Sequence, residues 1–344
     1  MSKVRVAING FGRIGRAFFR EAIERNDIKI VAINDLGEVD NLAYLLKYDS
    51  VYGRSELDVT ATTHALEIGG ERIPFISERD PGKLPWREYD VDVALEATGV
   101  FASYEQSQAH LTAGARRVVI SAPVKDEPSS GISGATVLMG VNDEKLATCD
   151  ISSNASCTTN AGSPIVQILK EKLGIEKAML NTVHGYTASQ SLVDGPSKKD
   201  YRRGRAAAQN IVPSSTGAAL ATTKAITDLE GNFDGIAMRV PVSVGSIVDI
   251  TFIASKNTTI EEVNGILREA VKEDRWQGIF TVTEDPIVSS DIIGNIHASI
   301  ADLSFTRVVG GNLVKVLSWY DNEAGYTHTL VEHIVKTGKH ALSS

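Results

Sequence analysis

One of the two cysteines in this chain lies in a run of small polar residues, Ser153-Asn-Ala-Ser-Cys157-Thr-Thr-Asn160. The residues that follow, from Pro164 to Lys172, carry apolar side chains at helical spacing, which predicts a helix close to the thiol. A helix N-terminus offers unpaired N–H groups and a positive dipole end, and both favour the nucleophilic thiolate. A lone cysteine is otherwise as a rule a small buried apolar residue. Cys157 is therefore a candidate nucleophile that requires a partner.

His184 is the candidate partner. It ends the predicted strand Ala178–His184 and follows Cys157 by 27 residues. An unperturbed thiol has a pKa of about 8.5 and is mostly protonated at neutral pH, so a neighbouring imidazole that accepts its proton would activate it. The second cysteine, Cys149, precedes no helix start and no comparable polar run. Cys157 with His184 as its base is therefore a candidate catalytic pair, and a purely structural role for His184 stays open at this point.

The N-terminal segment has the pattern of a dinucleotide site. A buried strand, Val4–Asn9, leads into Gly10-Phe-Gly12-Arg-Ile-Gly15, then a helical pattern, a second buried strand Ile28–Asn34, and Asp35. In such sites the first glycine makes the tight turn, the second lets the backbone approach the pyrophosphate, and the third packs helix on strand. An acid about 20 residues further on accepts the adenosine ribose hydroxyls and repels a 2′-phosphate. Asp35 therefore predicts NAD rather than NADP.

Anion-binding groups occur later in the chain. Ser214-Ser-Thr216-Gly217 opens a helix predicted over Thr216–Asp228, whose N-terminus suits a phosphate. Arg239 ends a buried-looking strand, where a charge is costly without an anionic partner. Thr187 and Arg202 lie in a long irregular segment, from Thr187 to Asn210, of a length that is usually functional. Together these residues suggest a phosphorylated substrate and a second oxyanion.

The order of predicted elements indicates two domains. Alternating strands and helices up to about residue 152 predict an α/β, Rossmann-type parallel sheet, with a hairpin at Leu57–Ser77. Beyond it, hairpin-linked strands and interspersed helices predict an α+β catalytic domain with a mostly antiparallel sheet. The expected limits are 1–152, completed by the C-terminal helix 319–344, and 153–318 for the catalytic domain.

Composition excludes several other classes of protein. The chain has 344 residues and a net charge of −8, which argues against non-specific nucleic-acid binding. Its sequence contains no apolar run of membrane-spanning length, no signal peptide and no cysteine–histidine spacing typical of a metal site. We expect no metal, no membrane partner and a cytoplasmic location.

Taken together, the motifs resemble phosphorylating glyceraldehyde-3-phosphate dehydrogenases, in that family's order and over essentially the whole chain. The segments that carry the resemblance are Ile8–Arg16, Asn34-Asp35, Ser153–Asn160, His184–Thr187, Asp194–Ser197, Ser215–Ala219, Arg239–Pro241 and Trp319–Glu323.

The resemblance implies oxidation of glyceraldehyde 3-phosphate to 1,3-bisphosphoglycerate with NAD and inorganic phosphate, through a thiohemiacetal and a thioester on Cys157. It implies that the substrate phosphate binds Thr187, Arg202 and Arg239, and that the attacking phosphate binds Ser156, Thr158, Thr216 and Gly217. It implies contacts to the cofactor from Arg13, Ile14, Asp35, Arg79, Ser121 and Asn322, beside the glycine turn. A homotetramer is the expected assembly.

Two alternatives remain open. Erythrose-4-phosphate dehydrogenase would use the same thiol and hydride chemistry, although Ser215-Thr216-Gly217-Ala218 and Asp35 resemble the triose-phosphate enzymes better. A nucleotide-binding regulator without catalysis is a different class, because a fold alone does not establish an activity. The presence of both Cys157 and His184 speaks against the regulator, since a pure binding protein needs no activated thiol.

Overall fold

The computed structural model describes residues 3–198 and 200–343. The chain divides into two compact units. Of the described residues, the first unit holds 3–137, 142–155 and 327–343, and the second holds the others.

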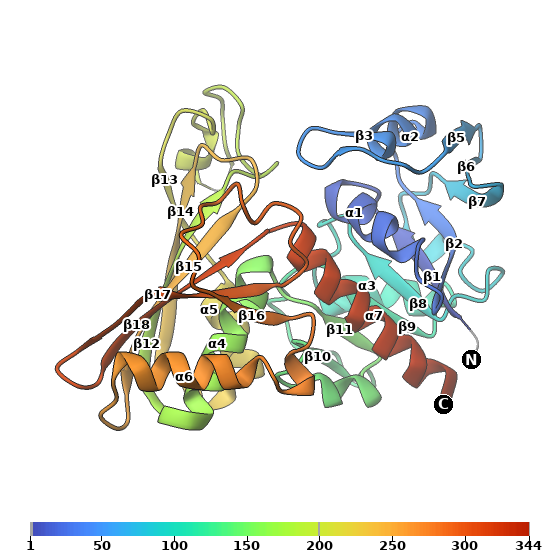
Figure 1. Cartoon of the computed structure of the whole chain (residues 1–344). Helices are drawn as coiled ribbons and strands as arrows, with labels where there is room; N and C mark the ends of the chain where they lie inside the picture. Colours follow the sequence, from blue (N-terminus) through green and yellow to red (C-terminus); the bar gives the residue numbers. More distant parts are fainter. Residues whose placement is uncertain (1–2, 199, 344) are drawn as a thin grey trace. The chain divides into compact units, whose positions relative to one another are not determined.

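The described residues of the first unit form a nine-stranded sheet, in the order β10-β11-β9-β8-β1-β2-β7-β6-β5 (Figure 1). Its strands are β1 Val4–Asn9, β2 Ile28–Asn34, β5 Val59–Thr62, β6 Ala65–Ile68, β7 Glu71–Ile76, β8 Val93–Glu96, β9 Arg117–Ile120, β10 Gly134–Thr136 and β11 Ile151–Ser153. Pairing is parallel from β10 to β7 and antiparallel along β7-β6-β5. The predicted Rossmann-type parallel sheet is confirmed, and the predicted hairpin is its antiparallel edge.

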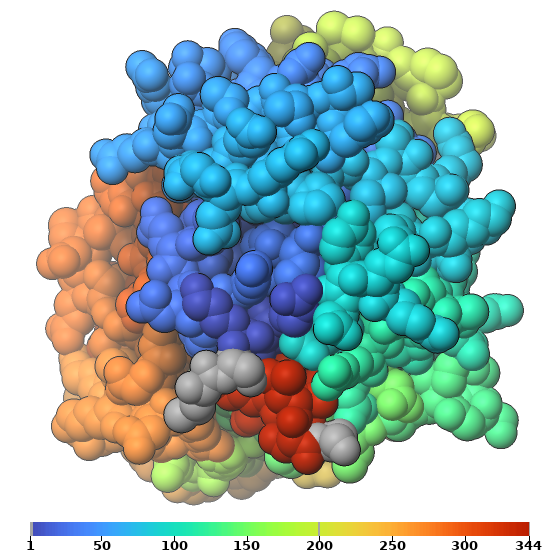
Figure 2. Space-filling model, turned by 90° about the vertical axis from the view of Figure 1, so that its right-hand side faces the viewer, coloured from blue at the N-terminus to red at the C-terminus, as the bar shows by residue number. Residues whose placement is uncertain are grey.

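Helices cover this sheet. They are α1 Arg13–Ala22, α2 Val39–Lys47, α3 Tyr104–Thr112 and most of α7 Ala324–Ser343, and the short strands β3 Tyr48–Asp49 and β4 Gly53–Arg54 pair beside them. The end of α7 lies against the first strand, because a Cβ on Gly338 would meet the side chain of Val4 (Figure 2). Glu332 on α7 also forms an ion pair with Arg25, at 2.5 Å.

The described residues of the second unit form a seven-stranded sheet, in the order β13-β14-β12-β15-β18-β17-β16. Its strands are β12 Ile175–Gly185, β13 Val212–Ser215, β14 Phe233–Val240, β15 Ser246–Ala254, β16 Phe280–Thr283, β17 Ser299–Val309 and β18 Leu313–Tyr320. Only the β12–β14 and β16–β17 pairs are parallel, so the predicted mostly antiparallel sheet is confirmed.

One face of this second sheet is covered by α4 Cys157–Leu173, α5 Ala218–Ala225 and α6 Ile260–Ala270 (Figure 1). Residues along β12 and β15 alternate between buried and more exposed positions, as expected for a sheet with one covered face. The packing against α4 is close, because a Cβ on Gly162 would lie 3.1 Å from the side chain of Leu180. Small residues in the first turns of α4 permit this approach.

Two predicted helix starts are wrong. The helix expected from Pro164 begins at Cys157, because residues of low helix propensity are stabilised there by burial under the sheet and by a side-chain cap. The helix expected over Thr216–Asp228 covers only Ala218–Ala225, followed by a 3₁₀ turn at Thr227–Leu229. The first correction places the thiol in the first turn of its helix.

Candidate active site

The start of α4 is built by hydroxyl groups. Ser156 is the N-cap, and its Oγ accepts a hydrogen bond from the backbone N–H of Thr159 at 3.1 Å. Ala155 has a φ of +54°, a conformation that residues other than glycine adopt rarely. The Oγ of Ser153 holds this turn, because it accepts from the N–H of Ala155 at 3.0 Å and donates to the carbonyl of Ala122 at 2.6 Å. Cys157 therefore occupies a fixed position at a helix N-terminus.

Cys157 and His184 are in contact. The Sγ of Cys157 lies 3.3 Å from Nε2 of His184, whose side chain is 2% exposed. The ring of His184 stands edge-on to that of Tyr320, with centroids 5.9 Å apart. This is the distance expected between a thiol and the imidazole that takes its proton.

The second nitrogen of His184 faces two competing partners. Arg239 is the register partner of His184 on the neighbouring parallel strand, and its Nη1 lies 2.6 Å from Nδ1. The carbonyl oxygen of Gly185 lies 2.7 Å from the same nitrogen. Nδ1 either accepts from the guanidinium or donates to the carbonyl, because one nitrogen does not do both. Arg239 thus bears directly on the proton arrangement of the base.

Burial governs the charge of this pair. Burial raises the pKa of the Cys157 thiol, although Arg239 and the N–H groups at the start of α4 oppose the rise. Burial and then the charge of Arg239 lower the pKa of His184 to about 3, against a smaller opposing effect of the Gly185 carbonyl. The thiol and the imidazole are therefore both neutral at neutral pH, and the helix N-terminus alone does not produce a thiolate.

Tyr320 joins this site, and sequence reasoning did not identify it. Its hydroxyl lies 2.9 Å from Oγ1 of Thr158 and 2.8 Å from Oγ1 of Thr182, and burial raises its pKa well above the usual range of tyrosine. Thr158, expected to bind the attacking phosphate, is thus engaged in a buried network. The motif Trp319–Glu323 contained the signal, because Tyr320 lies within it.

The predicted phosphate-binding residues lie in several segments of the second unit. Thr187 follows β12 and its Oγ1 lies 2.9 Å from Oγ of Ser189. Thr216 precedes α5 and accepts from the N–H of Ala218 at 3.1 Å, while Gly217 is the N-cap of α5. Arg202 lies exposed in the 3₁₀ turn Tyr201–Gly204.

Arg203 is a further cation that sequence reasoning missed. Its Nη2 donates to the carbonyl of Ser215 at 3.3 Å. Burial lowers the pKa of Arg239, and the neighbouring charge of Arg203 contributes to that shift, so the two guanidiniums lie close enough to interact. A pair of partly buried cations beside the helix that opens at Ala218 suits a phosphate group.

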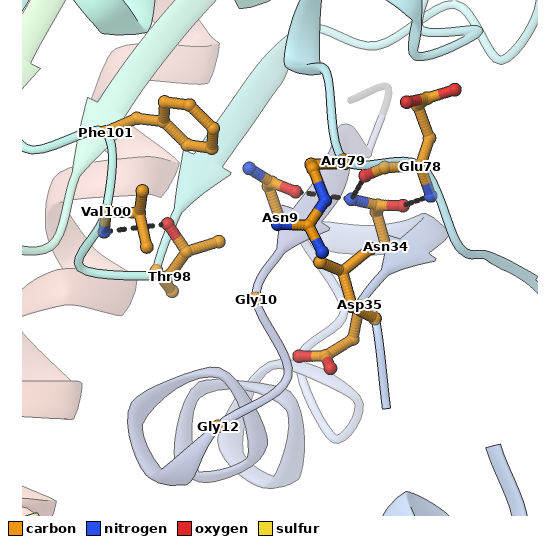
Figure 3. Close-up of a pocket in the computed structure, with 12 residues that line it drawn as sticks. Asn9, Gly10, Gly12, Asn34, Asp35, Glu78, Arg79, Thr98, Val100 and Phe101 are labelled. Carbon is orange, nitrogen blue, oxygen red and sulfur yellow. Dashed lines mark hydrogen bonds between the residues drawn. The ribbon is translucent and has the colours of Figure 1, made fainter. Parts of the chain in front are cut away.

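The first unit contains a cavity of about 280 Å³ at the carboxyl ends of β1, β2 and β8 (Figure 3). Four residues predicted to bind the cofactor, Gly10, Gly12, Asp35 and Arg79, line this cavity. The full lining is Asn9, Gly10, Gly12, Asn34, Asp35, Leu36, Glu78, Arg79, Ala97, Thr98, Val100 and Phe101. This edge is where parallel sheets bind nucleotides. Leu36, Val100 and Phe101 provide an apolar surface for a base, and Arg79 provides a cation.

The three glycines of the fingerprint have different surroundings. Gly10 has a φ of +98°, and a Cβ there would lie 2.6 Å from the backbone nitrogen of Thr98. A Cβ on Gly15 would lie 2.1 Å from the carbonyl oxygen of Gly10, so this glycine lets the helix start close to the turn. Gly12 lines the cavity and has no neighbouring atom within 4 Å of a Cβ position, which leaves room for a ligand against the backbone.

Asp35 lies beside this turn. Its carboxylate accepts hydrogen bonds from the N–H of Phe11 at 2.6 Å and of Gly37 at 2.8 Å, and it lines the cavity. The arrangement of glycine turn, acid and apolar wall fits an adenine dinucleotide such as NAD.

The other residues predicted to bind the cofactor lie elsewhere. Arg13 forms an ion pair with Asp49 at 2.9 Å, and Ile14 follows it in α1. Ser121 directly follows β9, where its N–H donates to the carbonyl of Glu96 at 2.9 Å. Asn322 belongs to the second unit, and its Oδ1 accepts from Ser246 Oγ at 3.0 Å and from the N–H of Gly245 at 3.2 Å.

The described residues contain no group of three or more His, Cys, Asp or Glu side chains arranged to hold a metal ion. Within the same part of the chain, every helix is too short or too polar to cross a membrane.

Comparison with known proteins identifies the family. Residues 4–104 match the family described as glyceraldehyde 3-phosphate dehydrogenase, NAD binding domain, and residues 156–322 match its C-terminal domain. The chain is 46% identical to glyceraldehyde-3-phosphate dehydrogenase 2 of Streptomyces avermitilis over 338 residues, which are 97% of this chain and 98% of that protein. It is 47% identical to the glyceraldehyde-3-phosphate dehydrogenase of Bacteroides fragilis, over 96% of this chain and 97% of that one. With glyceraldehyde-3-phosphate dehydrogenase 1 of Bacillus subtilis the identity is 45%, over 97% and 99% of the two chains. The chain therefore belongs to the glyceraldehyde-3-phosphate dehydrogenase family.

Proposed function

We propose that Cys157 and His184 perform the chemistry of a phosphorylating, NAD-dependent glyceraldehyde-3-phosphate dehydrogenase. The observation that carries this proposal is the contact of 3.3 Å between the thiol at the first turn of α4 and Nε2 of His184. The family supplies the reaction: glyceraldehyde 3-phosphate, NAD and inorganic phosphate give 1,3-bisphosphoglycerate.

In the first half-reaction, Sγ of Cys157 attacks the aldehyde carbon while Nε2 of His184 accepts the thiol proton. The imidazolium returns that proton to the carbonyl oxygen, which gives a thiohemiacetal. Bound NAD supplies the acceptor for the hydride that leaves this carbon. His184 takes the hydroxyl proton as the hydride departs, and the carbonyl of a thioester on Cys157 forms.

In the second half-reaction, an oxygen of inorganic phosphate attacks the thioester carbonyl. The bond to Sγ breaks, the acyl group leaves as the mixed anhydride, and Cys157 is released as a thiolate. The imidazolium of His184 stabilises this leaving thiolate. The first half-reaction needs His184 neutral at its start, which agrees with its depressed pKa of about 3, and the second starts from the imidazolium that the first leaves.

We assign the substrate phosphate to Thr187 and Arg239, with Arg202 or its neighbour Arg203 as the second cation. Arg203 is the better placed of the two, because its charge acts on Arg239 whereas Arg202 is exposed. A bound dianion next to Arg239 would offset the charge that lowers the pKa of His184. Substrate binding would thereby strengthen the base.

We assign the attacking phosphate to Ser156, Thr158, Thr216 and Gly217. The structural support for this assignment differs among the four residues. Gly217 is the N-cap of α5 and has no side chain, so an anion can approach the N–H groups of the first turn that follow Ala218. Ser156 and Thr158 already take part in hydrogen bonds to Thr159 and Tyr320, so their backbone N–H groups at the start of α4 are the stronger donors.

For NAD we assign the cavity of the first unit, with Gly10, Gly12 and Gly15 shaping the turn, Asp35 accepting the ribose hydroxyls and Arg79 at the wall. Arg13, Ile14, Ser121 and Asn322 remain proposed contacts to the cofactor.

The domain limits 1–152 with 319–344, and 153–318, are likewise a proposal, as is a cytoplasmic location.

We also propose a homotetramer. The open face of the second sheet exposes Met179 (57%), Ile236 (46%) and Phe305 (51%). The irregular segment from Thr187 to Asn210 exposes Leu192 (80%) and Tyr201 (86%). Apolar side chains gathered at such positions are typical of surfaces that a partner covers. Sedimentation equilibrium of the purified chain measures the assembly, and a monomer at micromolar concentration contradicts this proposal.

The activity is tested with purified protein. NADH formation from NAD and glyceraldehyde 3-phosphate is expected only when phosphate or arsenate is present, and faster than with erythrose 4-phosphate. Cys157→Ser should abolish turnover and keep NAD binding, because the thiol performs the chemistry and the first unit binds the nucleotide. Cys149→Ser is the matched control: Cys149 is buried, burial raises its pKa, and its loss should leave turnover intact. Equal turnover without phosphate would indicate a non-phosphorylating dehydrogenase.

A further inference from the structure

A buried carboxylate lies directly behind the nucleotide cavity. Glu96 ends β8 and is 2% exposed. Its Oε1 accepts from the N–H of Thr98 at 2.8 Å and from the hydroxyl of the same residue. Its Oε2 accepts from Nδ2 of Asn9 at 2.6 Å and lies 3.1 Å from Nε2 of His110. Four polar groups therefore converge on one side chain.

The protons of this network are fixed from one end by a tryptophan. Trp86 and His110 are both fully buried, and Nε1 of Trp86 lies 2.9 Å from Nδ1 of His110. The indole nitrogen only donates, so Nδ1 of His110 accepts. A neutral imidazole then carries its proton on Nε2, and that proton points to Glu96.

The backbone of Glu78 fixes the other end. Its N–H donates to Oδ1 of Asn34 at 2.9 Å, and its carbonyl accepts from Nδ2 of Asn34 at 2.9 Å, so this amide has one orientation. Nδ2 of Asn34 also donates to Oδ1 of Asn9 at 2.7 Å (Figure 3). Asn9 therefore turns its own NH₂ group toward Glu96. All four groups that reach Glu96 are donors, so the carboxyl group carries no proton and is a buried negative charge.

Two direct partners of Glu96, Asn9 and Thr98, lie in segments that line the nucleotide cavity, and Asn9 connects Glu96 to two more such segments through Asn34 and Glu78. Asn9 precedes Gly10, Asn34 precedes Asp35, Glu78 precedes Arg79, and Thr98 follows the end of β8 (Figure 3). We propose that Glu96 is a positioning residue for the cofactor: its buried charge holds these four segments in the arrangement that binds NAD. This inference rests on the proposed binding of NAD in this cavity.

Glu96→Gln tests the charge at constant size. The amide NH₂ faces donors on either side, because it meets Thr98 in one orientation and Asn9 with His110 in the other. Trp86 and the Glu78 backbone prevent the partners from reversing. A buried donor facing a donor is costly, so the segments separate in the free protein and the ligand must restore them. We expect the Kd of NAD to rise about tenfold.

Asp92 provides the matched control. It is a second buried carboxylate, 1% exposed, and directly precedes the first residue of the strand that Glu96 ends. It accepts from the N–H of Arg5 at 2.9 Å and pairs with Arg116 at 3.5 Å, and it does not line the cavity. Asp92→Asn should lower the thermal midpoint as a buried charge substitution does, with the Kd of NAD within twofold of wild type.

The experiment is isothermal titration of NAD and of ADP-ribose, which lacks the nicotinamide, into wild type and the two variants. A Kd raised for both ligands in Glu96→Gln but not in Asp92→Asn supports the positioning role. An unchanged Kd in Glu96→Gln, or an equal rise in Asp92→Asn, overturns it. If wild type binds neither ligand, the proposed function fails instead.

Should Glu96→Gln not fold, Glu96→Asp replaces it. This variant keeps the charge but is one methylene shorter, so it reaches Thr98 and loses Asn9 and His110. Its Kd should rise relative to wild type, by less than the tenfold expected for the amide. A Kd equal to that of wild type contradicts the inference.

Discussion

His333 makes the stability of the first unit depend on pH. It lies fully buried on α7, with Nε2 2.7 Å from Oγ of Ser152 and Nδ1 3.0 Å from Oδ1 of Asn154. The hydroxyl donates and the amide oxygen accepts, so the neutral imidazole satisfies both. Burial lowers the pKa of His333 to about 3, and the more distant charge of Asp143 opposes this only weakly. Protonation would place a charge in the core and face the Ser152 hydroxyl with a second donor.

The size of the effect follows from the two pKa values. The imidazole takes up a proton near pH 6.5 in the unfolded chain and near pH 3 in the folded one, so acid favours the unfolded state. The stabilisation is fully present above pH 6.5 and is lost as the pH falls toward 3. Over the whole window it amounts to about 5 kcal/mol, and between pH 7 and pH 5 to about 2 kcal/mol.

The variant His333→Gln keeps a donor and an acceptor but does not titrate. Urea unfolding followed by circular dichroism at pH 7, 6 and 5 gives the free energy of unfolding of both proteins. The variant should be less stable at pH 7, and it should lose about 2 kcal/mol less than wild type between pH 7 and pH 5. His184 titrates in both proteins and cancels in the comparison. Equal losses in the two proteins would refute the assignment of this pH dependence to His333.

Three further predictions concern ligand binding. Gly15→Ala should lower the thermal midpoint strongly, because its Cβ would lie 2.1 Å from a carbonyl oxygen. Gly12→Ala should keep the thermal midpoint and raise the Kd of NAD about tenfold, and a Kd equal to that of wild type would contradict this. Asp35→Gly should relax discrimination against NADP in steady-state kinetics, and an unchanged cofactor ratio would show that the acid is not at the ribose. Arg203→Leu should raise the KM for glyceraldehyde 3-phosphate more than Arg202→Leu does, since only Arg203 acts on Arg239; the reverse order would restore Arg202 as the principal cation.

Local patterns were sufficient to predict the nucleotide-binding half of the fold. The strands Val4–Asn9 and Ile28–Asn34 agree with the structure to the residue, because buried apolar runs ending in a glycine turn and an acid allow few other structures. The start of α4 was not predictable in this way. Residues 157–163, apart from Ala161, have low helix propensity, and burial against the sheet, as at Gly162, together with the Ser156 cap makes them helical.

Of the contacts in the active site, too, some could be predicted from the sequence and others could not. The contact of Cys157 with His184 was expected from the polar run around the thiol and from the strand end at His184, both visible in the sequence. The contact of Arg239 with His184 depends on the register of β12 against β14, which no local pattern specifies. Tyr320 comes from a strand that is not adjacent to β12, and the neutral state of the thiol depends on burial. Such features become visible only in the folded chain.

Trapping the thioester tests the central role of Cys157 most directly. The protein is mixed with NAD and glyceraldehyde 3-phosphate without phosphate, quenched in acid and digested, and the peptides are analysed by mass spectrometry. One 3-phosphoglyceroyl group is expected on Cys157, none on Cys149, with one NADH formed per site, and added phosphate should remove the adduct. NADH formation without an acyl group on Cys157, or with the acyl group on another residue, would contradict the mechanism.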